Sequence, residues 1–184
     1  EGVESITNKP FFLYVARIEH PGKNHFNLLK AYENLPSSIT DQYDLILAGQ
    51  KWSGSEEVFD YWQTMALKGN VHFPGFVTNE VMSALYSGAS IYIFPSFYEG
   101  FGIPLLEAMS FGLPVICSNT PSLVEVGGPA VELFHPNLIE DISKKIIEVA
   151  SDVELQESMV LKGHERIKLF SWEKHTKVLV GLVD

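Results

Sequence analysis

Residues 91–108 read Ile91-Tyr92-Ile93-Phe94-Pro95-Ser96-Phe97-Tyr98-Glu99-Gly100-Phe101-Gly102-Ile103-Pro104-Leu105-Leu106-Glu107-Ala108, a succession of strand, loop and helix. The first four residues are all apolar, which is typical of a strand buried on both faces of a parallel sheet. Pro104 suits the first position of a helix, because its missing N–H would have no partner there anyway. Gly112 predicts the end of this helix, which we expect to cover about residues 104–111.

The same alternation of apolar strands and helices continues along the chain. Four runs are apolar on both faces: residues 11–15, 45–48, 91–94 and 115–117. Two shorter, more mixed runs are expected nearer the edges of a sheet: residues 71–73 and 131–134. Helices are expected over residues 25–35, 55–67, 79–87, 104–111, 139–151 and 153–170, with another beginning at Ser171. This order predicts a doubly wound α/β sheet, in which ligands bind beyond the carboxyl ends of the strands.

The composition predicts a single globular domain. Of the 184 residues, 46% are apolar and 20% are charged, a balance typical of folded proteins. The net charge of −10 argues against an extended nucleic-acid surface. Cys117 is the only cysteine, which excludes an intrachain disulfide and favours a reducing, cytoplasmic compartment. No apolar stretch has transmembrane length and no signal peptide opens the chain, whereas residues 1–10 are expected to be a linker or a cut end.

The loop and helix of residues 91–108 have features of a site for an anionic, polyhydroxylated ligand. Gly100 and Gly102 lack a Cβ, so a ligand can approach the backbone closely. Free N–H groups near Gly102 and Ile103, at the positive end of the helix dipole, favour a phosphate. Glu99 and Glu107 would repel phosphate, so these carboxylates better suit sugar hydroxyls. The spacing of the two glutamates alone favours ordinary exposed residues, and the surrounding sequence is what favours a site.

Two further loops follow predicted strands. Arg17 and Lys23 flank a Pro-Gly turn after the first strand, where they could pair with a diphosphate or be a solvated basic pair. Val77 follows the third strand, and its backbone could hydrogen-bond a planar base, although any loop offers such groups. Thr78 or Asn79 is expected to cap the next helix. The histidines lack the spacing of metal ligands, so no metal site is predicted. The sequence also shows no nucleophile with an obvious base.

These motifs together resemble the C-terminal domain of retaining GT-B glycosyltransferases of family 4. The similarity rests on Arg17 and Lys23, on the turn at residues 75–77, and on the stretch from Glu99 to Met109. It extends over nearly the whole chain from Phe11 to Leu182, and includes residues 112–116, 118–125 and 170–172. The resemblance implies a Rossmann-like doubly wound sheet that forms one half of a GT-B fold, with a nucleoside-diphosphate sugar as its ligand.

The resemblance also implies a role for each site residue. Glu99, Arg17 and Lys23 would be the catalytic residues, with the two cations on the diphosphate and Glu99 on hydroxyls of the transferred sugar. The groups that bind the rest of the donor would be the ribose-binding carboxylate of Glu107, the backbone of Val77 at the base, and the backbone N–H groups of Gly100, Phe101, Gly102 and Ile103. Because two cations and helix N–H groups can stabilise the leaving group, no metal cofactor is expected.

The family pattern further implies a division of labour with sequence outside this chain. Residues 11–170 would bind the donor, and residues 171–184 would form a helix that packs toward a missing N-terminal domain. That domain would hold an acceptor sugar or a lipid-linked glycan, as in polysaccharide biosynthesis, and the full-length enzyme could associate peripherally with a membrane. Two alternatives stay open from the residues: a GT-B nucleotide-sugar epimerase, and a non-catalytic α/β interaction domain. No nucleic-acid partner is expected.

Overall fold

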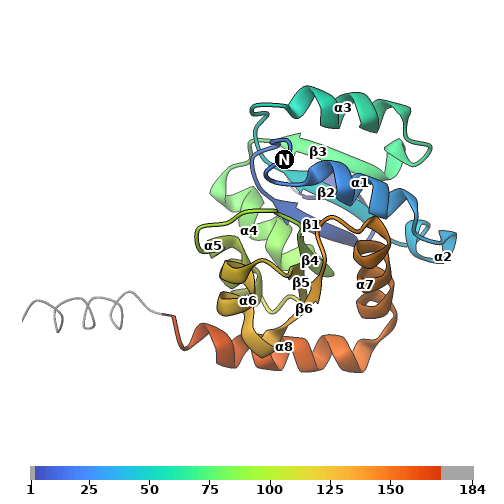
Figure 1. The fold of residues 1–184 in the computed structure, drawn as a ribbon. Helices are drawn as coiled ribbons and strands as arrows, with labels where there is room; N and C mark the ends of the chain where they lie inside the picture. The colour runs from blue at the N-terminus through green and yellow to red at the C-terminus, as the bar shows by residue number, and fades with distance from the viewer. Residues whose placement is uncertain (1–2, 171–184) are drawn as a thin grey trace, which may run out of the picture.

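Six parallel strands form one sheet in the computed structural model, which describes residues 3–170. Their order across the sheet is β3-β2-β1-β4-β5-β6 (Figure 1). The strands are β1 Phe11–Val15, β2 Asp44–Ala48, β3 Val71–Gly75, β4 Ile91–Phe94, β5 Val115–Ser118 and β6 Val131–Phe134. The two short, mixed runs are the edge strands β3 and β6, as their sequences predicted, and the four continuous apolar runs form the interior of the sheet.

Helices cover both faces of this sheet, which confirms the predicted doubly wound, Rossmann-like architecture. α1, α3 and α7 lie on one face and α4, α5 and α6 on the other, while α8 packs against α5 and α7 (Figure 1). The α-helices are α1 His25–Glu33, α2 Ser37–Thr40, α3 Ser55–Thr64, α4 Asn79–Gly88, α5 Ile103–Ser110, α6 Pro121–Gly127, α7 Ile139–Ser151 and α8 Val153–Ile167. Short 3-10 helices are formed by Val3–Ser5, Lys68–Asn70 and Gly128–Ala130.

Two helices, α2 and α6, were not predicted from the sequence. Several predicted helix ends differ by a few residues from those in the structure. α2 and α6 are too short to show a helical repeat of apolar residues, which was the signal used for the longer helices. The local signals for helix ends were more reliable. Thr78 caps α4 by accepting a hydrogen bond from the N–H of Val81 at 3.4 Å. Gly112 follows α5 with a left-handed φ of 73°, as expected of a residue that ends a helix.

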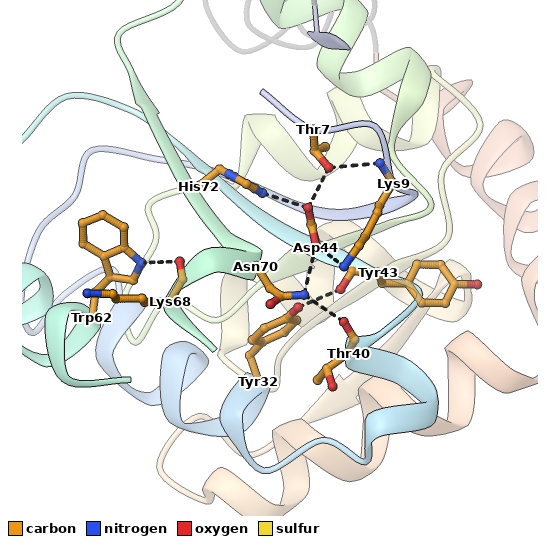
Figure 2. A network of polar contacts seen from close by, with 10 residues as sticks. All are labelled: Thr7, Lys9, Tyr32, Thr40, Tyr43, Asp44, Trp62, Lys68, Asn70 and His72. Atoms are coloured by element: carbon orange, nitrogen blue, oxygen red, sulfur yellow. Dashed lines mark hydrogen bonds and ion pairs between the residues drawn. The ribbon is translucent and has the colours of Figure 1, made fainter. Parts of the chain in front are cut away.

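A buried carboxylate at the amino end of β2 fixes the segment that precedes β1 (Figure 2). The carboxylate of Asp44 accepts hydrogen bonds from Thr7 at 2.6 Å and Asn70 at 3.3 Å, and its Oδ2 lies 2.8 Å from Nε2 of His72. Lys9 adds an ion pair at 3.4 Å. Burial would raise the pKa of Asp44, but the hydrogen bonds from Thr7 and His72 outweigh it and lower that pKa. Thr7 and Lys9 belong to the predicted linker and are tied to the sheet.

The direction of strand order reverses between β1 and β4, which are neighbours in the middle of the sheet. β2 and β3 extend the sheet on one side of this point, and β5 and β6 extend it on the other. In open parallel sheets the loops that leave such a pair of strands diverge and create a ligand-binding crevice at their carboxyl ends. Here these loops are residues 16–24 and 95–102, the segments that carry six of the predicted site residues.

Candidate functional site

Backbone hydrogen bonds fix the loop after β1 to the loops beside it. The N–H of Ile18 donates to the carbonyl of Gln50 at 2.8 Å, and the carbonyl of Ile18 accepts from the N–H of Trp52 at 2.9 Å. The N–H of Phe97 donates to the carbonyl of Gly22 at 3.0 Å, which joins the loops after β1 and β4. These three loops therefore form a connected rim around the carboxyl ends of β1, β2 and β4.

Asn24 holds this rim at the start of α1. It has a left-handed φ of 58°, a conformation that asparagine tolerates better than most residues. Its side-chain amide donates to the carbonyls of Pro95 and Pro136, both at 2.9 Å, and the side chain is buried. The amide thus links α1 to the segments that follow β4 and β6.

Lys23 and Glu99 meet across the switch point. The Nζ of Lys23 lies 2.7 Å from Oε1 of Glu99, and only 19% and 12% of the two side chains are exposed. The carbonyl of Lys23 accepts a hydrogen bond from the hydroxyl of Tyr14 at 3.0 Å, and that hydroxyl also lies 2.9 Å from Oγ of Ser96. The structure therefore brings together two of the three predicted catalytic residues and supports the lysine backbone from the buried strand β1.

Arg17, the third of these residues, has different partners. Its guanidinium forms an ion pair with Glu19 at 3.1 Å and lies over the ring of Trp52, 4.9 Å from the ring centroid. More than half of the Arg17 side chain is exposed, at 53%. Arg17 is thus at the same rim as Lys23 but stacked toward the loop after β2. Neither Glu19 nor Trp52 was recognised from the sequence as a partner of Arg17.

Glu107 lies in the second turn of α5, a helix that begins at Ile103, directly after Gly102. Gly102 has a φ of 93°, and a Cβ there would lie 2.6 Å from Cδ2 of Leu123, so both conformation and space require glycine. Glu107 is exposed, and its Oε2 accepts a hydrogen bond from the hydroxyl of Tyr86 at 3.0 Å. Tyr86 was also missed, because a tyrosine on the apolar face of a helix reads as an ordinary core residue.

The loop between β4 and α5 leaves open space beside its backbone. A Cβ on Gly100 would have no neighbour within 4 Å. Phe101 and Ile103 are 45% and 56% exposed, and Phe101 contacts the ring of Phe170 edge to face. Val77, in the loop after β3, is partly buried against the core. Of the residues predicted to bind the donor through their backbone, Val77 and residues 100–102 therefore lie in the loops after β3 and β4, and Ile103 is the first residue of α5.

Buried titratable groups near this rim are neutral. Burial lowers the pKa of His25 to about 3 and raises the pKa of the Cys117 thiol. His25 packs against the ring of Tyr14, with ring centroids 4.8 Å apart. Among residues 3–170 no group of three or more His, Cys, Asp or Glu side chains could hold a metal ion. Within the same residues no helix has the length and apolar character needed to cross a membrane.

Comparison with known proteins relates this chain to glycosyltransferases. Residues 2–166 match the family described as glycosyl transferases group 1. The chain is 39% identical over 166 residues to O-antigen chain mannosyltransferase B of Escherichia coli, covering 90% of this chain and 43% of that protein. It is 31% identical over 179 residues to the serotype-specific mannosyltransferase WbdA of Escherichia coli, covering 94% of this chain and 22% of that protein.

Solved structures share the fold. Sucrose-phosphate synthase from Thermosynechococcus elongatus superposes with a TM-score of 0.82 at 27% identity, over 96% of this chain and 45% of that one. HepE of Anabaena, solved in complex with UDP and glucose, superposes with a TM-score of 0.83 at 18% identity, over 98% of this chain and 49% of that one. The chain therefore spans less than half the length of each of these proteins, as expected of one half of a GT-B fold.

Proposed function

Because the chain belongs to the glycosyl transferases group 1 family, we propose that it is the donor-binding half of a retaining glycosyltransferase that uses a nucleoside-diphosphate sugar. The observation that carries this proposal is the Lys23–Glu99 contact at 2.7 Å, between the two loops that leave the switch point. A cation beside a carboxylate suits a ligand that has a diphosphate next to a sugar. In open parallel sheets this is also the place where nucleotides bind.

We assign a part of the donor to each of these residues on the basis of its charge. Lys23 and Arg17 are suited to the diphosphate, and the first N–H groups of α5 add the partial positive charge of a helix N-terminus. Glu99 is suited to accept hydrogen bonds from hydroxyls of the transferred sugar. Donor binding then exchanges the internal Lys23–Glu99 contact for one contact to the diphosphate and one to the sugar. Glu107 takes the ribose hydroxyls, and the backbone of Val77 takes the base.

The same groups stabilise the leaving group during transfer. The bond between the anomeric carbon and the phosphate oxygen breaks, and a bond to the acceptor oxygen forms on the same face of the sugar. The acceptor proton is released, and the departing diphosphate gains negative charge. Lys23, Arg17 and the α5 N–H groups offset this charge from fixed positions, which is the arrangement that lowers a barrier most. We therefore expect donor binding to need no divalent metal.

The named relatives favour a particular sugar and acceptor. Two of them are mannosyltransferases, and one is named for an O-antigen chain. We infer a mannosyl donor and a polysaccharide acceptor, with the acceptor held by a part of the whole protein outside this chain. A panel of nucleoside-diphosphate sugars, including mannose and glucose conjugates of GDP, UDP and ADP, tests the inference directly. A clear preference for a non-mannosyl donor would contradict it.

Calorimetric titration of GDP, UDP and ADP in the presence of a chelator tests the proposal. At least one should bind, and Lys23→Ala should weaken it by about 10- to 150-fold, since a charged hydrogen bond is worth roughly 1.5–3 kcal/mol. Lys145→Ala is the matched control, because Lys145 contacts Glu132 and Glu148 at 2.9 Å and is as little exposed as Lys23, at 17% against 19%. Absence of binding, or binding only with a divalent ion, would refute the assigned chemistry.

A further inference from the structure

Tyr86 of α4 contacts Glu107 of α5 through its hydroxyl. The hydroxyl donates to Oε2 of Glu107 at 3.0 Å, and Tyr86 is 2% exposed whereas Glu107 is exposed. The contact therefore reaches from the buried layer between α4 and the sheet to a carboxylate at the surface. Since α4 and α5 belong to different strand–helix units, nothing in the local backbone of α5 supplies this hydrogen bond.

The ring of Tyr86 is held from two sides. It stacks on Phe111 with centroids 5.3 Å apart and planes 13° from parallel, and it packs against Tyr92 at 5.7 Å. Tyr92 in turn donates a hydrogen bond of 3.4 Å to the carbonyl of Val15, the last residue of β1. The hydroxyl of Tyr86 is thereby placed by the strands of the switch point, β1 and β4. The negative charge of Glu107 and above all burial raise the pKa of Tyr86, so the phenol keeps its proton.

We propose that Tyr86 is a positioning residue, which fixes the carboxylate of Glu107 so that its other oxygen can accept a hydrogen bond from the ribose of the donor. The inference rests on the proposed function. An exposed glutamate on a helix has several rotamers, and ordering it costs free energy when a ligand binds. The hydrogen bond to Oε2 removes most of this freedom before the ligand arrives. Oε1 has no protein hydrogen-bond partner among the described residues.

A purely structural role for Tyr86 predicts a different outcome. The stacking contacts with Phe111 and Tyr92 belong to the ring, and Tyr86→Phe keeps the ring. The hydroxyl interacts with the carboxylate of Glu107 and also with the hydroxyl of Tyr92. Since the ring contacts remain in Tyr86→Phe, its fold should stay intact. The effect of Tyr86→Phe on nucleotide binding therefore separates the hydroxyl from the ring.

A double-mutant cycle tests the proposal, with the dissociation constant of the nucleoside diphosphate that binds best as its readout. In the otherwise unchanged protein, Tyr86→Phe should weaken binding by about three- to tenfold, the range of one hydrogen bond. In the Glu107→Ala background the same substitution should have no further effect. Tyr61→Phe is the control: it removes a Tyr–Glu hydrogen bond of 2.7 Å, to Glu33, that lies outside the rim. It should leave binding unchanged.

Three results would overturn the inference, and they differ from one another. Equal losses in both backgrounds would mean that the hydroxyl acts without Glu107. No loss in either background would mean that Glu107 needs no positioning. If the unchanged chain binds none of the nucleotides, the proposed function fails, and the role of Tyr86 falls with it. Thermal unfolding of each variant shows whether an observed loss reflects unfolding instead.

Discussion

Nζ of Lys23 lies 2.7 Å from Oε1 of Glu99, so the two loops that leave the switch point are joined by a largely buried ion pair. Each charge compensates the other in a place where water has little access. On the proposed function, this pair would separate, at least in part, when a diphosphate and a sugar bind. We therefore expect the ion pair to contribute to the stability of the chain and, on the proposed function, to selectivity for a ligand that replaces both partners.

Removal of one partner should destabilise the chain more than removal of both. We expect Lys23→Ala to lower the free energy of unfolding by about 1–3 kcal/mol, because it leaves Glu99 with little solvent and no cation. Adding Glu99→Ala should recover part of that loss. Urea unfolding of the two single variants and the double variant measures the coupling. Strictly additive losses would show that the pair contributes nothing as a pair.

Glu107 and Glu99 should contribute to the binding of different parts of the donor. Glu107→Ala should weaken binding of the nucleoside diphosphate and of its sugar conjugate alike, by roughly 1.5–3 kcal/mol, the contribution of a hydrogen bond to a charged acceptor. Glu99→Ala should weaken mainly the sugar conjugate, since Glu99 is assigned to sugar hydroxyls. Titration of both ligands against both variants decides the matter. If Glu99→Ala weakened binding of the two ligands equally, this division of labour would be rejected.

The contribution of Arg17 to diphosphate binding should depend on Trp52. The guanidinium lies 4.9 Å from the centroid of the indole ring, and such contacts at exposed positions are worth about 0.5–1 kcal/mol. Trp52→Ala should therefore weaken diphosphate binding by about two- to fivefold, and Trp52→Phe should restore most of it. In an Arg17→Ala background Trp52→Ala should have little effect. A Trp52→Ala loss that persists without Arg17 would instead indicate direct contact between the indole and the ligand.

The fold was predictable because its signals are local. The apolar run Ile91–Phe94 and the mixed runs beginning at Val71 and Val131 indicated which strands lie inside the sheet and which at its edges. Thr78 and Gly112 marked helix ends by their own chemistry. The Asp44 network was not predictable in this way. It joins Asp44 to Thr7 and to the neighbouring residues Asn70 and His72, three segments that are far apart in sequence and meet only when β1, β2 and β3 are paired (Figure 2).

The site was predictable at the level of loops but not of contacts. The carboxyl ends of parallel strands converge, so Lys23 and Glu99 could be expected near each other. The direction of a side chain depends on torsion angles that sequence spacing does not determine. The contact between the guanidinium of Arg17 and the ring of Trp52 could therefore not be predicted. The hydroxyl of Tyr86 gave no signal, because its ring alone accounts for its place in the core. The expected helix from Ser171 lies outside the described residues.

Stability in acid should depend on Asp44. The pKa of Asp44 is lowered in the folded chain, so its ionised form contributes stability above the pKa of the unfolded chain. This contribution is lost as the pH falls from about 3.9, the ordinary aspartate value, through the lower folded value. Asp44→Asn should reduce stability at neutral pH by about 1–3 kcal/mol and flatten the decline in acid. The control is Asp60→Asn, at an exposed position of α3. At each pH from 7 to 2 its unfolding curve should match that of the unchanged chain.

Transfer should need more than this chain. We expect the 184 residues alone to bind the donor but to transfer no sugar, since the polar rim that we describe is assigned entirely to the donor. Positioning of the acceptor beside the anomeric carbon supplies much of the rate of a two-substrate reaction, and a closed cleft also excludes water. The chain spans 43% of its mannosyltransferase B relative, which leaves room for an acceptor-binding part in the whole protein. Product analysis with donor and a mannan oligosaccharide, on the chain alone and on the whole protein, measures both. Robust transfer by the chain alone would place an acceptor site within these residues, whereas formation of an epimerised nucleotide sugar by the whole protein would favour an epimerase.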